Sequence, residues 1–307
     1  MIACFDIGGS SIKAARATSA AEVELIGSRP TPLHDFDAFA AALRDLLSHP
    51  TMPPDGPLAI SITGVINPAT SIIKVANIPC IDGRPLADDL RQRLSRPVII
   101  ANDADCFALA EALHGAGRGK RIVFGAILGT GVGGGLVIDG QLIVGAGGFA
   151  GEWGHGPVAA TEAGNPPVAI PRFPCGCGQV GCVDTIGGAR GLERLHAHLH
   201  AQSCSSRDII AAWDRGDVAA SRTVDIFIDL LASPLALVVN IVGADLVPVG
   251  GGLSYSATLV ARLDEAVRRR ILRRLDRPLV VPAQCRVEPG LIGAASLGFR
   301  EADHART

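Results

Sequence analysis

The chain has 307 residues, of which 48% are hydrophobic and 19% charged, so it holds enough apolar side chains for well-packed cores in about two domains. With 28 basic and 30 acidic residues, its net charge of −2 argues against nucleic acid or an anionic membrane as a partner. The N-terminal residues lack the basic and apolar runs of a secretory signal, which favours a cytoplasmic protein. The longest apolar stretch, residues 226–249, contains Asp229, Pro234 and Asn240, so it predicts a buried helix and strand rather than a membrane span.

The first half of the chain alternates between strand and helix patterns. Apolar residues 2–5, a glycine turn and residues up to Ala15 predict two strands, and further strands are expected at 58–63, ending at Gly64, and at 98–101. Helical spacing predicts helices over 36–47, with Asp35 as the N-cap, over 86–94, and over 106–113, where Gly115 ends the helix. This alternation is typical of an α/β domain with a mainly parallel sheet.

A second half begins at Ile122–Leu128, where the pattern of the N-terminus returns. The strand 122–128 leads into a glycine-rich segment, residues 129–135, and then into a strand at 136–138 that ends at the turn Asp139-Gly140. A third glycine cluster, 250–252, follows an expected strand at 246–249. We expect residues 161–174 to form a loop and residues 262–275 to form a solvated helix.

Three glycine-rich turns therefore follow directly after apolar strands. Glycine lets backbone N–H groups approach phosphate oxygens closely, and three such turns favour phosphate binding where a single one would more often be a plain turn. The sequence has no P-loop motif, and the run from Gly129 to Gly133 leads into a strand rather than a helix, which argues against a dinucleotide fingerprint.

The pair Asn102-Asp103 lies where a predicted strand ends and a helix begins, which is where open α/β sheets bind ligands. A carboxylate at this position can accept the proton of a hydroxyl group that attacks phosphorus. The alternative is that both residues only cap the following helix, and Asp105 is a second candidate carboxylate.

A histidine and three cysteines form the most specific pattern in the sequence. His155 ends the run Gly151-Glu152-Trp153-Gly154-His155, and Cys175, Cys177 and Cys182 follow within a short glycine-rich segment. Four such ligands predict a closed structural zinc site, whereas the alternative is a group of free buried cysteines without a metal. The other five cysteines are scattered, and we expect no disulfides.

Taken together, these motifs resemble the ROK family of bacterial sugar kinases and repressors, and they run in the family's order from Asp6 to Gly252. The resemblance implies a two-domain, actin-like ATPase fold of the ribonuclease H-like type, with an active-site cleft between the domains. It implies a small α/β domain over 1–105 plus 290–307 and a large α/β domain over 106–289 that carries the zinc loop. Because the chain starts at the first phosphate strand, it resembles the kinases rather than the repressors.

The family pattern also implies roles for individual residues. Asp103 would be the general base, Asp6 would orient Mg²⁺, and zinc would hold His155 for the sugar. The residues expected to contact ATP are Asp6, Gly8, Gly9, Ser10, Lys13, Gly129, Thr130, Gly131, Gly133, Gly251 and Gly252. The residues expected to contact the sugar are Gly64, Asn77, Asn102, Asp103, Glu152, His155 and Asp184.

Within the family, the runs 102–109 and 127–135 most resemble bacterial N-acetylglucosamine kinases, while 151–155 is also close to ROK fructokinases. We therefore expect transfer of the γ-phosphoryl group of ATP to the 6-hydroxyl of N-acetylglucosamine by a homodimeric enzyme. Fructokinase or glucokinase activity is the alternative, and a sugar sensor without turnover is the non-enzyme alternative. The chain departs from the family at Asp184, where Glu is usual, and at Asp105, where Asn is common.

Overall fold

The computed structural model describes residues 1–304, which form two compact units. Unit 1 comprises Met1–Gly115, Gln141–Ala150 and the residues from Cys285 onward, and unit 2 comprises Ala116–Gly140 and Gly151–Gln284. The sequence-based boundary at residue 105 would place the helix that follows it in the large domain. In the structure that helix belongs to unit 1, because it packs against the C-terminal helix.

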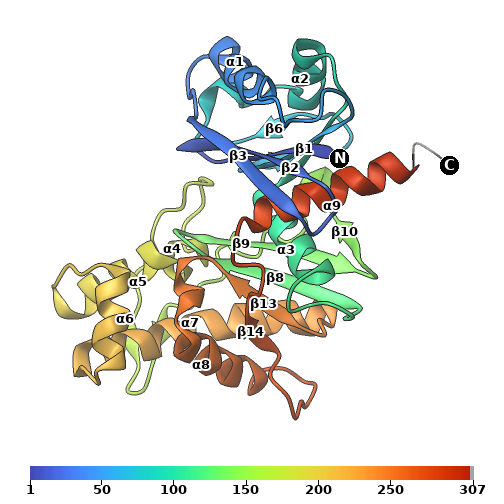
Figure 1. Ribbon diagram of the computed structural model, residues 1–307. Helices are drawn as coiled ribbons and strands as arrows, with labels where there is room; N and C mark the ends of the chain where they lie inside the picture. The colour runs from blue at the N-terminus through green and yellow to red at the C-terminus, as the bar shows by residue number, and fades with distance from the viewer. Residues whose placement is uncertain (305–307) are drawn as a thin grey trace. The chain divides into compact units, whose positions relative to one another are not determined.

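A five-stranded sheet with the order β3-β2-β1-β4-β7 forms the centre of unit 1 (Figure 1). Its strands are β1 (Ile2–Ile7), β2 (Ser11–Ala17), β3 (Val23–Pro30), β4 (Leu58–Ile62) and β7 (Val98–Asn102). β1, β4 and β7 are parallel, but β2 pairs antiparallel with both β1 and β3. The expected parallel pairing therefore holds for β1, β4 and β7. The sheet is nevertheless mixed, because the glycine turn after β1 folds the chain back at once and makes β2 antiparallel to both neighbours.

Helices cover both faces of this sheet. On one face, α1 (Phe36–Leu47) and α2 (Leu86–Leu94) bury Ala3, Phe5 and Ile7 of β1. On the other, α3 (Asp103–Leu113) and α9 (Pro289–His304) pack against Ile2 and Cys4. Because successive strand residues point to opposite faces, Asp6 lies on the face of α9. Unit 1 also contains β5 (Val65–Ile66), β6 (Ile73–Lys74), β10 (Gln141–Ile143) and the short helices η1 (Pro79–Ile81) and η2 (Ala146–Gly148).

Four strands of the second sheet lie in unit 2, in the order β9-β8-β13-β14. They are β8 (Ile122–Leu128), β9 (Val132–Ile138), β13 (Val247–Gly250) and β14 (Val280–Pro282), of which only β9 is antiparallel to its neighbour. β9 begins at Val132, four residues before the expected start at Leu136. Gly133–Gly135 pair with β8 and are part of the strand, so the expected glycine loop is shorter than its sequence suggests.

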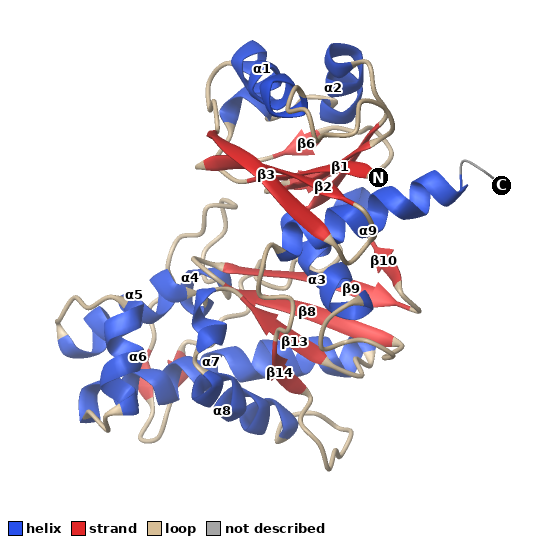
Figure 2. Ribbon diagram, in the orientation of Figure 1, coloured by secondary structure: helices blue, strands red, loops and turns tan. Residues whose placement is uncertain are grey.

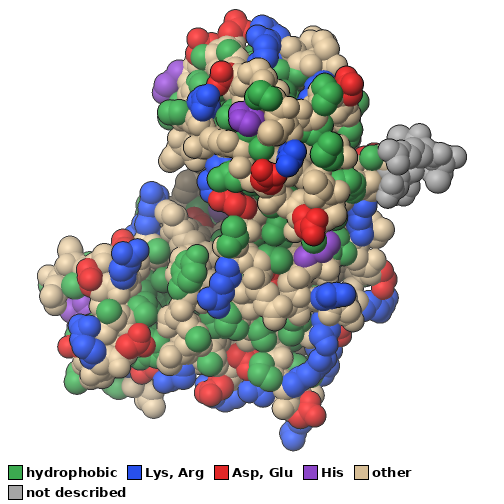
Figure 3. All heavy atoms as spheres, in the orientation of Figure 1, with side chains coloured by type: hydrophobic (Ala, Val, Ile, Leu, Met, Phe, Trp, Pro, Cys, Tyr) green, Lys and Arg blue, Asp and Glu red, His purple; other side chains and the backbone are tan. Residues whose placement is uncertain are grey.

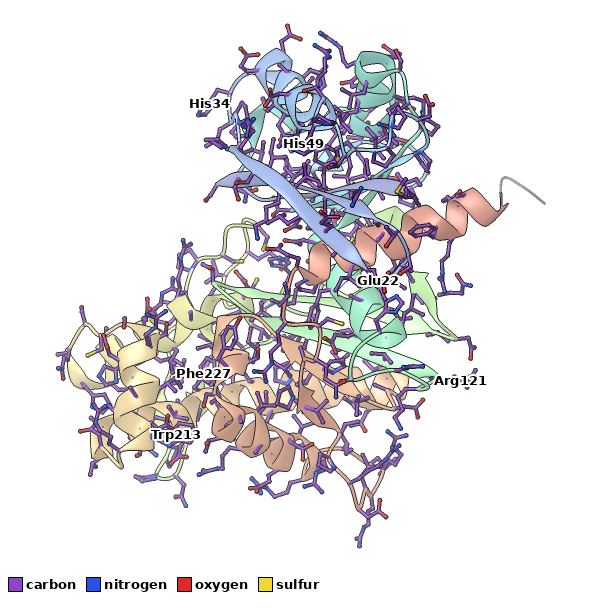
Figure 4. The ribbon with its side chains drawn as sticks, in the orientation of Figure 1. Glu22, His34, His49, Arg121, Trp213 and Phe227 are labelled. Carbon is purple, nitrogen blue, oxygen red and sulfur yellow. The ribbon has the colours of Figure 1, made fainter. Side chains whose placement is uncertain are left out.

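Six helices of unit 2 pack into one core (Figure 2). They are α4 (Asp184–Gly187), α5 (Ala189–His200), α6 (Ser206–Asp214), α7 (Val218–Val242), α8 (Ala257–Arg268) and η3 (Gly252–Tyr255). Phe227 of α7 is buried in this core, and Trp213 of α6 packs against it (Figure 4). The helix expected at 262–275 overlaps α8 only up to Arg268, because α8 begins at Ala257, and its inner side is buried. The expected loop 161–174 contains a small hairpin of β11 (Glu162–Ala163) and β12 (Val168–Ala169).

Among the described residues, α7 alone is long and apolar enough to cross a membrane by length and composition. Core helices of globular domains meet the same criterion, and about half of α7 is buried inside unit 2. Its buried apolar residues, including Phe227 and Leu231, belong to the core, whereas Val218, Leu237 and Ile241 are exposed. Acidic and basic side chains are interspersed over the face drawn in Figure 3, as the small net charge leads one to expect.

Candidate active site and metal centre

The first glycine turn joins β1 to β2 in unit 1. The N–H of Gly8 donates to the carbonyl of Ser11 at 3.0 Å, and the hydroxyl of Thr31 donates to the carbonyl of Gly8 at 2.7 Å. Ser10 at the tip of the turn is exposed. The side chain of Asn77 lies beside this turn, because a Cβ added to Gly9 would be 2.9 Å from its Nδ2. The structure thus brings Asn77, expected at the sugar, next to residues expected at ATP.

Asp6 ends the same strand and is held by its neighbours in unit 1. Its Oδ1 accepts a hydrogen bond from the Ser61 hydroxyl at 2.7 Å, and a Cβ on Gly290 would lie 2.5 Å from that oxygen. Burial raises the pKa of the Asp6 carboxyl, while the Ser61 hydroxyl and Lys13 lower it and Glu288 raises it. A carboxylate at this position offers the hard oxygen ligand that Mg²⁺ prefers.

Lys13, expected to contact ATP, forms an ion pair with Glu288 at 2.9 Å. No local sequence pattern predicted a role for Glu288, which has a positive φ of 48° and precedes the first residue of α9. The dipeptide Glu288-Pro289 could have indicated that a helix begins here, since proline is typical of the first position of a helix.

Asn102 and Asp103 lie at the start of α3, at the carboxyl end of β7. The Asn102 Oδ1 accepts from the backbone N–H groups of Ala104 at 2.8 Å and Asp105 at 3.4 Å, so Asn102 does cap the helix. Its Nδ2 also donates to the carbonyl of Gly64 at 2.8 Å and keeps a second hydrogen. Asp103 is exposed, and its Oδ1 accepts from the N–H of Ala104 at 2.9 Å. The structure therefore brings Gly64, Asn102 and Asp103 together.

In unit 2 the second and third glycine clusters are in direct contact. Gly251 has a φ of 85°, and a Cβ there would lie 2.5 Å from the carbonyl oxygen of Leu128, immediately before Gly129. The turn Gly129–Gly131 closes on itself through a 3.0 Å bond from the N–H of Gly129 to the carbonyl of Gly131. Thr130 at its tip is exposed. Two glycine turns thus form one backbone-lined surface within unit 2.

The glycines of β9 serve a different purpose from that expected of a phosphate loop. A Cβ on Gly134 would lie 2.7 Å from Cδ1 of Trp153 and 2.9 Å from the carbonyl of Gly151, so the segment 151–154 lies directly on the strand. The Trp153 indole N–H donates to the carbonyl of Gly133 at 2.8 Å, which fixes this contact. The strand thereby positions Glu152 and His155.

His155, Cys175, Cys177 and Cys182 come together as predicted, with one ligand atom from each within 4.8 Å of the others. The sulfur atoms of Cys177 and Cys182 are 3.7 Å apart, as are the Cys175 sulfur and His155 Nδ1. A tetrahedral zinc ion with Zn–S bonds of about 2.3 Å separates its sulfur ligands by about 3.8 Å. The four side chains therefore fit zinc in both chemistry and spacing.

The surroundings of these ligands also suit a metal. Nδ1 of His155 faces the cysteines while Nε2 is 3.6 Å from the Glu152 carboxylate, the usual partner of a metal-bound imidazole. Burial raises the pKa of Glu152, His155 lowers it and Asp184 raises it. A backbone N–H of Gln179 lowers the pKa of Cys177 to about 7, whereas burial raises that of Cys175 to about 12. Metal binding must displace the Cys175 proton and should weaken at low pH.

Asp184 lies two residues after Cys182, at the first position of α4. Its Oδ1 accepts the N–H of Val132 at 2.7 Å, and its Oδ2 is 3.8 Å from the Cys175 sulfur. The carboxylate expected at the sugar is thus bonded to the backbone beside the second glycine turn.

The chain combines mixed α/β sheets, glycine turns after β1, β8 and β13, and a Cys₃His centre. These features place it in the class of ATP-dependent sugar kinases with the actin-like ATPase fold. The ROK family model matches residues 2–301, and the chain belongs to the ROK family.

Curated relatives and solved structures agree with this assignment. The N-acetyl-D-glucosamine kinase of Escherichia fergusonii is 36% identical over 295 residues, covering 95% of this chain and 97% of that protein. The ROK hexokinase of Thermus thermophilus has a TM-score of 0.81 at 27% identity, covering 99% of both chains. A ROK family glucokinase from Streptomyces griseus, solved with glucose and AMPPNP, has a TM-score of 0.76 at 25% identity, covering 96% of this chain and 98% of that one.

Proposed function

We propose that this sugar kinase phosphorylates N-acetylglucosamine at its 6-hydroxyl with ATP, giving N-acetylglucosamine 6-phosphate and ADP. The main support for N-acetylglucosamine as the substrate is the 36% identity to N-acetyl-D-glucosamine kinases across 95% of the chain. We further propose a soluble, cytoplasmic homodimer, as the family resemblance implies.

In this proposal the two glycine surfaces bind the nucleotide. The turn Gly8–Ser10 of unit 1 would bring its backbone close to phosphate oxygens, and so would the turn Gly129–Gly131 of unit 2, against which Gly251 packs. Asp6 would hold Mg²⁺, whose charge neutralises the phosphate oxygens during transfer. The glucokinase bound to AMPPNP supports a nucleotide site of this kind in the family fold.

Asp103 is the proposed general base. Its exposed carboxylate lies at the N-terminus of α3, where it can accept a proton from a hydroxyl group. The hydroxyl oxygen of the sugar forms a bond to the γ-phosphorus, its proton passes to Asp103, and the bond to the ADP oxygen breaks. Asn102 orients another hydroxyl through its remaining Nδ2 hydrogen.

The Cys₃His centre supports the sugar side of the site. A closed four-ligand zinc leaves no position for water, so the ion would stabilise the segment that holds Glu152 and His155. Both residues then present carboxylate and imidazole atoms to sugar hydroxyls.

A coupled ADP-release assay with a panel of sugars tests this function. We expect the highest kcat/KM with N-acetylglucosamine, and lower values with N-acetylmannosamine, glucose, mannose and fructose. A preference for glucose or fructose would replace the substrate assignment by glucokinase or fructokinase. Sugar binding by calorimetry without ADP release from any sugar would instead indicate a sensor.

A further inference from the structure

The segment from Cys182 to Ala189 connects the Cys₃His centre to the second glycine turn within unit 2. On the metal side it begins with the ligand Cys182 itself. The N–H of Asp184 donates to the carbonyl of Gly154 at 2.8 Å, next to the ligand His155, and its Oδ2 lies 3.8 Å from the sulfur of Cys175. Asp184 is therefore adjacent to three of the four metal-binding side chains.

On the other side the same segment contacts the turn Gly129–Gly131 at several points. The Oδ1 of Asp184 accepts the N–H of Val132 at 2.7 Å, and the N–H of Ala189 donates to the carbonyl of Gly129 at 2.8 Å. A Cβ added to Gly188 would lie 2.6 Å from Cα of Gly131, so the two backbones are in close contact. The turn is thus bonded to the start of both α4 and α5.

The fit around the Asp184 carboxylate leaves little freedom. A Cβ added to Gly131 would lie 2.2 Å from its Oδ1, so the carboxylate occupies the space that a side chain at residue 131 would need. A glutamate would carry its carboxylate about 1.5 Å further, one carbon–carbon bond, and could not keep the same bond to Val132 without moving the turn. The aspartate is matched to the glycine turn.

We propose that Asp184 is a positioning residue that holds the Gly129–Gly131 turn in register with the Cys₃His centre, so that metal occupancy sets the affinity for nucleotide. This inference rests on the proposed function, in which that turn binds ATP. The metal centre thereby serves the nucleotide side of the reaction as well as the sugar side. Asp184 acts through the backbone of Val132 and contributes to phosphate binding without touching the sugar.

Binding of AMPPNP, measured by calorimetry with magnesium and without sugar, tests the proposal directly. We expect Asp184→Ala to weaken binding about fivefold to thirtyfold, since a short bond to a charged acceptor is lost. Asp184→Asn keeps a neutral oxygen for Val132 and should restore affinity to within about threefold of the original chain. Asp214→Ala, at the exposed end of α6, is the matched control and should change nothing.

A double-mutant cycle then tests the link to the metal. Cys177→Ser should lower both zinc content and AMPPNP affinity in the original chain, but should lower the affinity little further when Asp184→Ala is already present. Equal effects of Cys177→Ser in both backgrounds would overturn the proposal. So would an Asp184→Ala protein with unchanged AMPPNP affinity and a raised KM for the sugar alone.

Hydrogen exchange of the original chain supplies a measurement that needs no variant. Removing zinc with a chelator should speed exchange in peptides that contain Val132 while leaving those from the start of β8 unchanged. Unchanged exchange at Val132 after complete zinc loss would contradict the proposal. If the original chain itself binds no AMPPNP, the proposed function fails instead, and the two failures are distinguishable.

Discussion

The substitution Gly134→Ala tests whether β9 positions the segment that carries Glu152 and His155. The added methyl group would lie 2.7 Å from Cδ1 of Trp153, 2.9 Å from the carbonyl of Gly151 and 3.0 Å from Cζ of Phe124. Because β9 is paired along its length with β8, the strand cannot retreat. The segment 151–154 must therefore move away from the strand.

The expected cost follows from these contacts. Overpacking of a buried site costs about 1–3 kcal/mol. Losing the bond from the Trp153 indole N–H to the carbonyl of Gly133 adds about 0.5–1.5 kcal/mol. We therefore expect Gly134→Ala to lower the free energy of unfolding by about 1.5–4.5 kcal/mol. Gly27→Ala in β3 is the matched control, because its Cβ would meet Leu46 Cδ2 at an ordinary 3.6 Å.

Urea unfolding, zinc content and steady-state kinetics together measure the outcome. Gly134→Ala should unfold at lower urea, hold less zinc and have a raised KM for the sugar, while Gly27→Ala should match the original chain in all three. A Gly134→Ala protein with unchanged stability and sugar KM would refute the argument that the glycines of β9 make room for the segment 151–154.

Three further predictions follow from single residues. Asp103→Asn should lower kcat by about 10²–10⁴-fold while calorimetry still detects sugar binding, and an unchanged kcat would move the base to Asp105. Cys177→Ser should reduce zinc, measured by elemental analysis, and the unfolding temperature; folded, active original protein without zinc would contradict this. Because the native pKa of Asp6 lies above 3.8, the metal-free folded chain keeps this proton longer than the unfolded one, so stability should fall as pH rises from 3.8 through the raised pKa. Asp6→Asn should flatten that fall in a series of pH-dependent unfolding curves, and an identical slope in both proteins would reject the assignment.

Local patterns were sufficient to predict most elements. The helix over 36–47 has the predicted bounds, and the side chain of its N-cap Asp35 accepts from the N–H groups of Asp37 and Ala38. The helix over 86–94 and the strand over 122–128 also match. The Cys₃His group could be predicted because metal ligands are chemically distinctive and close in sequence.

Glycine composition alone could not separate turns from strands. Gly129 and Gly251 lie in turns. Gly134 lies in a strand, where glycine is required because an indole and a carbonyl occupy the space that a side chain would need. These contacts come from residues 151–153, almost twenty positions away, so no local sequence pattern could predict them. The partners of Lys13 and Asp184 were missed for the same reason, since Glu288 and Val132 are distant in sequence.

The Cys₃His centre can stabilise the site of a sugar kinase because its ligands belong to segments that hold other functional residues. His155 ends a segment seated on β9, Cys182 begins a segment bonded to the turn Gly129–Gly131, and Cys175 lies beside Asp184. Asn102 is held within unit 1 through the carbonyl of Gly64 and the first turn of α3, and neither of these contacts involves a metal ligand. Zinc removal should therefore weaken sugar and nucleotide binding through unit 2, while Asp103, the proposed base, and its helix keep their own structure. We therefore expect an enzyme that loses zinc to bind its substrates more weakly before its rate of proton transfer falls. Calorimetry measures the loss of binding, and kcat at saturating sugar measures the proton-transfer step separately.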